Sequence, residues 1–272
     1  MKLFIKTILL ILIATFESHA QIKVFTFNES KDGGYNFFAN NEEYCPVSIK
    51  IDFELNNLIS ANGNGVTYVV PARTKKFLLT SLNLVKKNAA YSFKSNSFSN
   101  YGDVNLSENN LSFIYSLPFE TGKSFKVDQG YNGTFSHQNE NALDFTMPIG
   151  TKIFSSRAGI IVKVVNNFNE NCPEKECTKY NNYIIVFHDD GTFSKYDHLK
   201  RNGVIVKEGE AIVENQLIGF SGNTGRSTGP HLHFMVYIQR LKSIESLKTK
   251  FKINNGLENE FLVEKETYLK NY

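Results

Sequence analysis

Histidines are the residues of this chain whose types and spacing suggest chemistry. The chain has six, and five of them lie between positions 137 and 233. Two of these, His231 and His233, alternate with apolar residues in the segment HLHF, directly after a glycine-proline step. On a β-strand, residues i and i+2 point to the same face, so the two imidazoles would lie side by side. Such a pair can hold a metal ion or place one metal ligand beside one catalytic group. Two structural histidines at a strand end are the alternative.

A hydrolytic metal site needs about three protein ligands and an open position for water. His137 and Asp144 are the additional candidates, because both lie in the short segment SHQNENALDF. Two neutral imidazole nitrogens and one anionic oxygen leave zinc enough positive charge to acidify water to a pKa of roughly 7. Asp144 alone could equally be a carboxylate that caps a loop.

A zinc peptidase also needs a group that moves protons. No His-Glu-x-x-His segment occurs in the chain, so the glutamate base of the helical zinc peptidases is missing. His198, in KYDHL, and His231 can take its place, since a neutral imidazole accepts a proton and an imidazolium donates one. His188, in VFHDDG, is interpreted as a structural histidine at a strand end.

Three motifs in this order resemble those of the lysostaphin/LytM-type zinc endopeptidases, which cut peptidoglycan: GxxSH…DFxMPxGT, YxHL and GxSGxTGxSTGPHLHF. The resemblance covers residues 118 to 240. It implies an antiparallel β-sheet with a groove floored by one zinc ion per chain. His137, Asp144 and His233 would be the zinc ligands, and His198 and His231 would lie beside the attacking water as catalytic residues.

One departure from the family pattern concerns the first two ligands. The family commonly has three residues between the histidine and the aspartate, whereas six intervene here, at positions 138–143. Glu140 lies in this spacer and is the alternative ligand. Two other functions also remain open: a zinc endopeptidase that acts on glycine-rich proteins, and a non-catalytic cell-wall-binding or activator protein of the same fold. The presence of all three ligands favours an enzyme.

The scaffold that positions these side chains is expected to be all-β. In VSIKIDFEL apolar and polar residues alternate, and similar short segments follow, separated by Asn, Gly and Ser clusters. This pattern predicts a small sandwich-like accessory domain over residues 21–115, without a catalytic cluster. Strand patterns such as GIIVKVV and YIIVF continue over residues 116–245, which form the predicted peptidase domain. The polar residues 246–272 are expected to form a tail packed loosely on the surface.

The first 20 residues have the layout of a secretory signal peptide: two lysines, a short apolar run, and small residues before Gln21. A retained membrane anchor is the alternative, although the apolar run is short for a span of about 20 residues. No other long apolar stretch occurs, so no membrane span is expected after cleavage. The prediction is an exported protein, periplasmic or extracellular. The net charge of +3 is too small to indicate a nucleic-acid partner.

Cysteines and glycines add two smaller inferences. Cys172 and Cys177 flank a polar PEKE segment and could form a disulfide in an exported protein, whereas Cys45 is left as a buried thiol. Three cysteines are too few for a zinc site of about four thiolates. The segment GFSGNTGRSTG is not a phosphate-binding loop, because Phe220 and Arg226 replace the glycine and lysine that such a loop requires.

Overall fold

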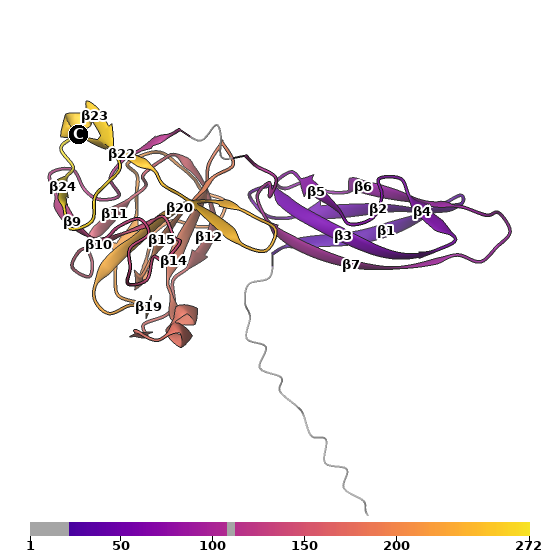
Figure 1. Ribbon diagram of the computed structural model, residues 1–272, viewed down its shortest axis with the longest axis horizontal. Coiled ribbons are helices and arrows are strands. Elements are labelled where there is room, and N and C mark those ends of the chain that lie inside the picture. Colours follow the sequence, from indigo (N-terminus) through magenta and orange to yellow (C-terminus); the bar gives the residue numbers. More distant parts are fainter. Residues whose placement is uncertain (1–21, 108–111) are drawn as a thin grey trace, which may run out of the picture.

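The computed structural model describes residues 22–107 and 112–272, which form two β domains beside each other along the longest axis of the molecule (Figure 1). The expected signal peptide over residues 1–20 lies outside the described residues. Within the described part, the chain has no helix of the length and apolar character needed to cross a membrane. The all-β fold class predicted from the sequence is confirmed.

The N-terminal domain consists of two antiparallel sheets that share one core. The four-stranded sheet has the spatial order β1 (Val24–Lys31), β2 (Gly34–Asn41), β6 (Phe77–Leu84) and β4 (Leu58–Ser60). The three-stranded sheet has the order β5 (Val66–Val70), β3 (Val47–Asn56) and β7 (Ser92–Tyr101). The alternation noted in VSIKIDFEL is that of β3, whose Val47, Ile49, Ile51 and Phe53 are buried between the two sheets.

The second domain is built on a nine-stranded antiparallel sheet (Figure 1). Its main path is β17 (Ala211–Ile212), β12 (Gly159–Val165), β14 (Tyr183–Phe187), β15 (Phe193–Asp197), β20 (His231–Gln239), β10 (Ala142–Thr146), β9 (Ser124–Gln129) and β24 (Thr267–Leu269). The ninth strand, β21 (Ile244–Leu247), pairs with β20 off this path. The segment HLHF thus opens β20, a central strand.

Smaller elements surround this sheet. One three-stranded sheet contains β11 (Lys152–Phe154), β18 (Leu217–Ser221) and β16 (Leu199–Val204). Another contains β23 (Glu258–Glu260), β22 (Lys250–Ile253) and β8 (Ile114–Tyr115). A parallel pair is formed by β13 (Asn171–Cys172) and β19 (Gly225–Arg226). The described part of this domain also contains two 3-10 helices, η2 (Lys175–Tyr180) and η3 (Asn254–Gly256).

The two faces of β20 have different roles. Leu232 and Phe234 point into the main core of the second domain and are almost completely buried. His231 and His233 alternate with them and therefore lie on the opposite face, as predicted from the period of a strand. Burial of the apolar residues on one face fixes the register, because a slip by one residue would exchange the two sets.

The two domains meet in a second apolar cluster. Tyr44, Cys45 and Tyr101 of the N-terminal domain pack against the second domain, at a group that includes Phe193 and Tyr237. We call this set the interdomain cluster. Tyr237 follows His233 by four positions on β20, so the cluster covers the same face of the sheet that carries the histidine pair.

Two parts of the sequence-based organisation differ in the structure. The short strand Ile114–Tyr115 was placed with the N-terminal domain, but it pairs with β22 and Tyr115 lies in the core of the second domain. Residues 246–272, expected from the sequence to be a loosely packed tail, supply β22, β23 and β24 and bury Lys270. The polar composition of this segment hid these strands, and the partners of β22 and β24 in the sheets, β8 and β9, lie more than 130 residues earlier in the chain.

Candidate metal centre

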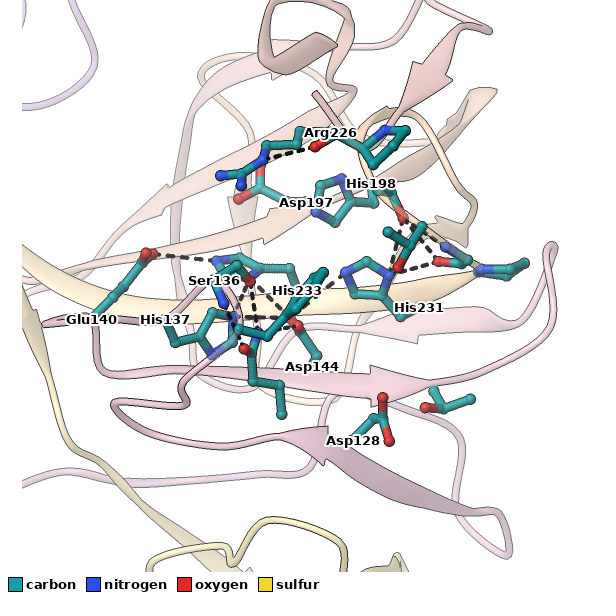
Figure 2. A pocket seen from close by; sticks show the side chains of 18 of the residues that line it. Asp128, Ser136, His137, Glu140, Asp144, Asp197, His198, Arg226, His231 and His233 are labelled. Atoms are coloured by element: carbon teal, nitrogen blue, oxygen red, sulfur yellow. Dashed lines mark hydrogen bonds and ion pairs between the residues drawn. The ribbon is translucent and has the colours of Figure 1, made fainter. Parts of the chain in front are cut away.

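Three of the predicted ligands come together at the start of β20 (Figure 2). The antiparallel register places Asp144 of β10 directly opposite His233. Asp144 Oδ1 lies 2.9 Å from His233 Nδ1 and 3.3 Å from His137 Nε2, and the two imidazole nitrogens are 3.2 Å apart. One ligand atom from each residue therefore lies within 4.8 Å of the others.

The turn before β10 orients His137. Its Nδ1 lies 3.0 Å from the carbonyl oxygen of Gly130, to which it donates, and this leaves Nε2 as the free lone pair that faces Asp144. Gln129 holds Asp144 and the residue before His137 in place. Its amide nitrogen donates to Asp144 Oδ2 at 3.0 Å, and its amide oxygen accepts from Ser136 N at 2.8 Å. Gln129 could not be identified from the sequence, because its contacts depend on the pairing of β9 with β10.

The six-residue spacer between the first two candidate ligands forms a tight turn. The Glu140 N–H donates to the carbonyl oxygen of His137 at 2.9 Å, and Asn139 adopts a left-handed backbone with φ of 60°. Glu140 Oε1 then lies 3.5 Å from Nε2 of His233, on the side of the ring that faces away from Asp144. Glu140, the alternative ligand, is thus not part of the group of three, and it contacts the far nitrogen of one member instead.

The chemistry of this donor set fits a zinc ion. Two imidazole nitrogens and one carboxylate oxygen converge on one point, which is the ligand combination of open, catalytic zinc sites. The other nitrogen of each imidazole is in contact with a protein oxygen, from Gly130 for His137 and from Glu140 for His233. Contacts of this type orient metal-ligating histidines in proteins.

The other two predicted site residues lie next to this group. The His231 ring is 4.6 Å from the His198 ring, centroid to centroid, and His231 Nε2 lies 3.7 Å from Asp144 Oδ1. Nδ1 of His231 donates to Gly229 O at 2.8 Å, and Nδ1 of His198 donates to Thr224 O at 2.7 Å. Each neutral ring therefore presents the lone pair of Nε2 as a proton acceptor.

Burial and charge set the protonation of the site. Burial raises the pKa of Asp144, but the contacts with His137 and His233 outweigh it and hold that pKa well below its usual range. For His233, burial lowers the pKa, and the contacts with Asp144 and Glu140 more than offset this and raise it to about 10. Burial, followed by the proximity of the His231 imidazole, lowers the pKa of His198 to about 4, so the His198 ring is neutral at neutral pH.

His188, interpreted from the sequence as structural, lies away from these residues. Its Nδ1 contacts Ala158 O at 2.8 Å and its Nε2 contacts Ser194 Oγ at 3.0 Å, so both nitrogens are satisfied. The side chain is completely buried, and burial lowers its pKa to about 4. These contacts leave no nitrogen for a ligand.

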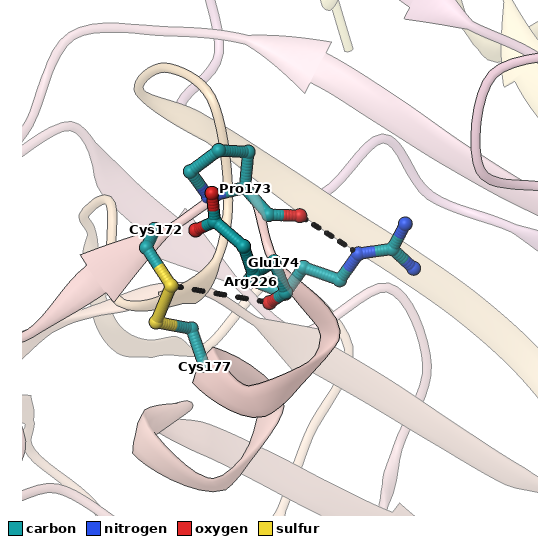
Figure 3. Close-up of a disulfide and its surroundings, with 5 residues drawn as sticks. All are labelled: Cys172, Pro173, Glu174, Cys177 and Arg226. Atoms are coloured by element: carbon teal, nitrogen blue, oxygen red, sulfur yellow. Dashed lines mark hydrogen bonds between the residues drawn. A yellow bond between two sulfur atoms is a disulfide. The ribbon is translucent and has the colours of Figure 1, made fainter.

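The site lies in a groove of about 770 Å³. Its lining includes Phe135, Pro173 and Thr178, together with Gly229 and Pro230 of the turn before β20. No described residue of the N-terminal domain lines the groove. The disulfide Cys172–Cys177 closes the loop that carries Pro173 (Figure 3) and forms as the sequence suggested, whereas Cys45 is a free, buried thiol.

Known proteins of similar sequence were found for this part of the chain. Residues 138–245 match the model of peptidase family M23. An uncharacterized metalloprotease of Buchnera aphidicola is 30% identical over 183 residues, which are 62% of this chain and 46% of that protein.

Two relatives carry more specific names. The peptidoglycan DD-endopeptidase ShyA of Vibrio cholerae is 32% identical over 117 residues, 43% of this chain and 24% of that protein. Lysostaphin of Staphylococcus simulans is 35% identical over 107 residues, 39% of this chain and 18% of that protein. The matches span less than half the length of each of these relatives. The grouped histidines and aspartate lie in or directly before the matched segment, and residues 138–245 are a domain of peptidase family M23.

Proposed function

We propose that this chain is an exported zinc-dependent endopeptidase that hydrolyses peptide bonds in peptidoglycan, in a cross-bridge or a stem peptide. The observation that carries the proposal is the convergence of His137, Asp144 and His233 at the floor of an open groove, with two further imidazoles beside them. The names of the relatives support the substrate, because ShyA is a peptidoglycan endopeptidase.

In this proposal His137, Asp144 and His233 would hold one zinc ion, and a bound zinc ion would supply Lewis-acid chemistry that polarises a carbonyl and acidifies water. The water oxygen attacks the carbonyl carbon, and Nε2 of His231 or His198 accepts its proton. The resulting imidazolium stabilises the negative charge on the carbonyl oxygen and then donates the proton to the leaving amine as the C–N bond breaks. Both rings suit this work because carbonyl oxygens hold their Nδ1 atoms.

Purified protein tests the proposal with three measurements. We expect one zinc ion per chain by metal analysis, release of muropeptides from purified peptidoglycan, and loss of this release after chelation with recovery on adding zinc. Casein and an elastin-like protein serve as parallel substrates. Release of peptides from these and not from the wall would identify a peptidase of glycine-rich proteins, and activity that survives exhaustive chelation would reject the metal mechanism.

Export is a separate part of the proposal, supported by the basic, apolar and small-residue pattern of residues 1–20. We expect the protein recovered outside the cytoplasm of the producing cells to begin at Gln21. N-terminal sequencing of this protein measures the cleavage site, and a chain that retains Met1 in the membrane fraction would indicate an anchor instead.

A further inference from the structure

The charged side chains that line the groove are nearly all paired. Lys265 Nζ lies 3.3 Å from Asp128 Oδ1 and 3.6 Å from Glu264 Oε1, and Lys195 Nζ lies 2.9 Å from Asp197 Oδ1. The two remaining carboxylates, Glu140 and Asp144, contact the histidines of the site. Each of these charged side chains has a polar or charged side-chain partner within the protein.

Arg226 is the exception. It lines the groove, its side chain is exposed, and among the described residues no carboxylate lies within ion-pair distance of its guanidinium. Its recorded partner is neutral: Nε donates to the carbonyl oxygen of Pro173 at 3.2 Å. Figure 3 shows the guanidinium directed away from the carboxylate of Glu174, the nearest acidic residue drawn. The terminal nitrogens are therefore free to donate to a ligand.

The backbone on both sides of Arg226 is fixed. Arg226 pairs in register with Cys172 of β13, whose loop is closed by the disulfide to Cys177. The Gly225 N–H donates to Glu170 O at 2.9 Å, and the Ser227 N–H donates to Cys172 O at 3.0 Å. These bonds, with the contact to Pro173, hold the side chain in one direction before any ligand arrives, which lowers the entropic cost of binding.

This fixed segment leads directly to the catalytic histidines. The hydroxyl of Ser227 lies 2.9 Å from Gly229 O and 3.3 Å from Nδ1 of His231. In Figure 2, Arg226 lies on the side of the site that carries Asp197 and His198, and Asp128 lies on the opposite side, with His233 between them. A substrate peptide whose scissile bond lies over the candidate ligands would therefore pass beneath the guanidinium.

We propose that Arg226 is a specificity-determining residue that binds a free carboxylate of the substrate peptide, close to the scissile bond. The inference rests on the proposed function. A planar guanidinium binds a carboxylate with two parallel hydrogen bonds, a geometry that neither a carboxamide nor a lysine reproduces. The substrate class is thus an anionic peptide, and peptides in which this carboxylate is amidated are poor substrates.

The experiment compares two forms of one substrate. Cross-linked muropeptides are prepared from a wall with free peptide carboxylates, and one half is converted to carboxamides by carbodiimide coupling with ammonia. We measure kcat/KM on both for the wild type, Arg226→Gln and Arg226→Lys. The matched control is Arg201→Gln, an exposed arginine outside the groove lining. Zinc content is measured for every variant.

The wild type and Arg201→Gln are expected to prefer the free carboxylates by about 10- to 100-fold, the range of a charged hydrogen bond. Arg226→Gln should lose this preference by cleaving the carboxylate form more slowly, with the amidated form and the zinc content unchanged. Arg226→Lys should keep a small part of the preference. Equal cleavage of both forms by the wild type, or a preference that survives in Arg226→Gln, would overturn the role proposed for Arg226 and leave the proposed function standing. If the wild type cleaves neither form, the proposed function falls, and the assignment falls with it.

Discussion

At the scale of single residues, the site contains two kinds of imidazole. Those of His137 and His233 belong to the group that could hold a metal ion, and those of His198 and His231 lie beside that group. His233 has a nitrogen 2.9 Å from Asp144, whereas His231, two positions earlier, is held by the carbonyl of Gly229. The same strand thus supplies two histidines whose near neighbours differ. The resemblance to a known family suggested these two roles, and the hydrogen bonds are consistent with them.

The two roles predict different effects of removing each imidazole. His233→Ala should lose both zinc and activity, because a ligand is removed and Asp144 and His137 alone bind the ion weakly. His231→Ala should keep zinc and lose activity by about 100-fold or more, the typical contribution of a proton-transfer group. Metal analysis and muropeptide release measure the two properties separately. Loss of zinc in His231→Ala would show that the roles are exchanged.

At the scale of the elements, the hairpin of β14 and β15 carries a buried histidine with no part in the site. His188 follows β14 and contacts Ser194 of β15. Burial lowers its pKa from 6.5 to about 4. Above pH 6.5 the ring is neutral in the folded and the unfolded chain. Between pH 6.5 and 4 the unfolded chain takes up a proton that the folded chain excludes, so the protein becomes less stable as the pH falls.

The different pKa of His188 in the folded and unfolded chain makes the free energy of unfolding depend on pH. His188 should lower the free energy of unfolding by about 2 kcal/mol between pH 7 and pH 5, at about 1.4 kcal/mol per unit below pH 6.5. Urea unfolding at the two pH values measures it. His188→Gln should show a pH dependence smaller by this amount, and Ser194→Ala, which keeps the imidazole, should show nearly the wild-type slope. Equal slopes in the wild type and in His188→Gln would contradict the prediction.

Patterns of neighbouring residues predicted where strands form, but they did not predict which strands pair with one another. The alternation in VSIKIDFEL gave β3, and the period of a strand gave the shared face of His231 and His233, because both depend on neighbouring residues. The strands after residue 246 were missed, since their pairing with β8 and β9 depends on contacts with distant segments. The contacts of Gln129 and Glu140 were missed for the same reason: each follows from a register or a turn, and neither residue type is unusual.

At the scale of the whole molecule, the interdomain cluster joins the N-terminal domain to the second domain, and no described residue of the N-terminal domain lines the groove. Cys45 lies in this cluster, is completely buried, and has a pKa raised from 9.0 to about 12 by burial. Tyr44 packs next to it, against Gly209 of the second domain. Since the other two cysteines form a disulfide, Cys45 is a specific chemical probe of the contact between the domains.

We expect Cys45 to react with a thiol reagent at pH 8 at least about 1,000-fold more slowly than an exposed cysteine, because the thiolate is the reactive species. Tyr44→Ala should increase this rate by about 10-fold or more by opening the cluster. Mass spectrometry of the labelled protein over time gives the rate. Tyr91→Ala, which changes a half-exposed tyrosine of the same domain outside the cluster, should leave the rate unchanged. Fast labelling of the wild type would mean that the domains separate in solution.

The alternation along β20 links the correct strand register to the formation of the candidate metal site. One face carries His231 and His233, and the other carries Leu232 and Phe234 for the core. A chain that pairs β20 one residue out of step would present leucine and phenylalanine to the groove and imidazoles to the core. Such a molecule could neither coordinate an ion nor close its interior. Metal bound at the proposed site would therefore require β20 to be paired in this register, and the metal content of a purified sample would measure the fraction of chains folded in it.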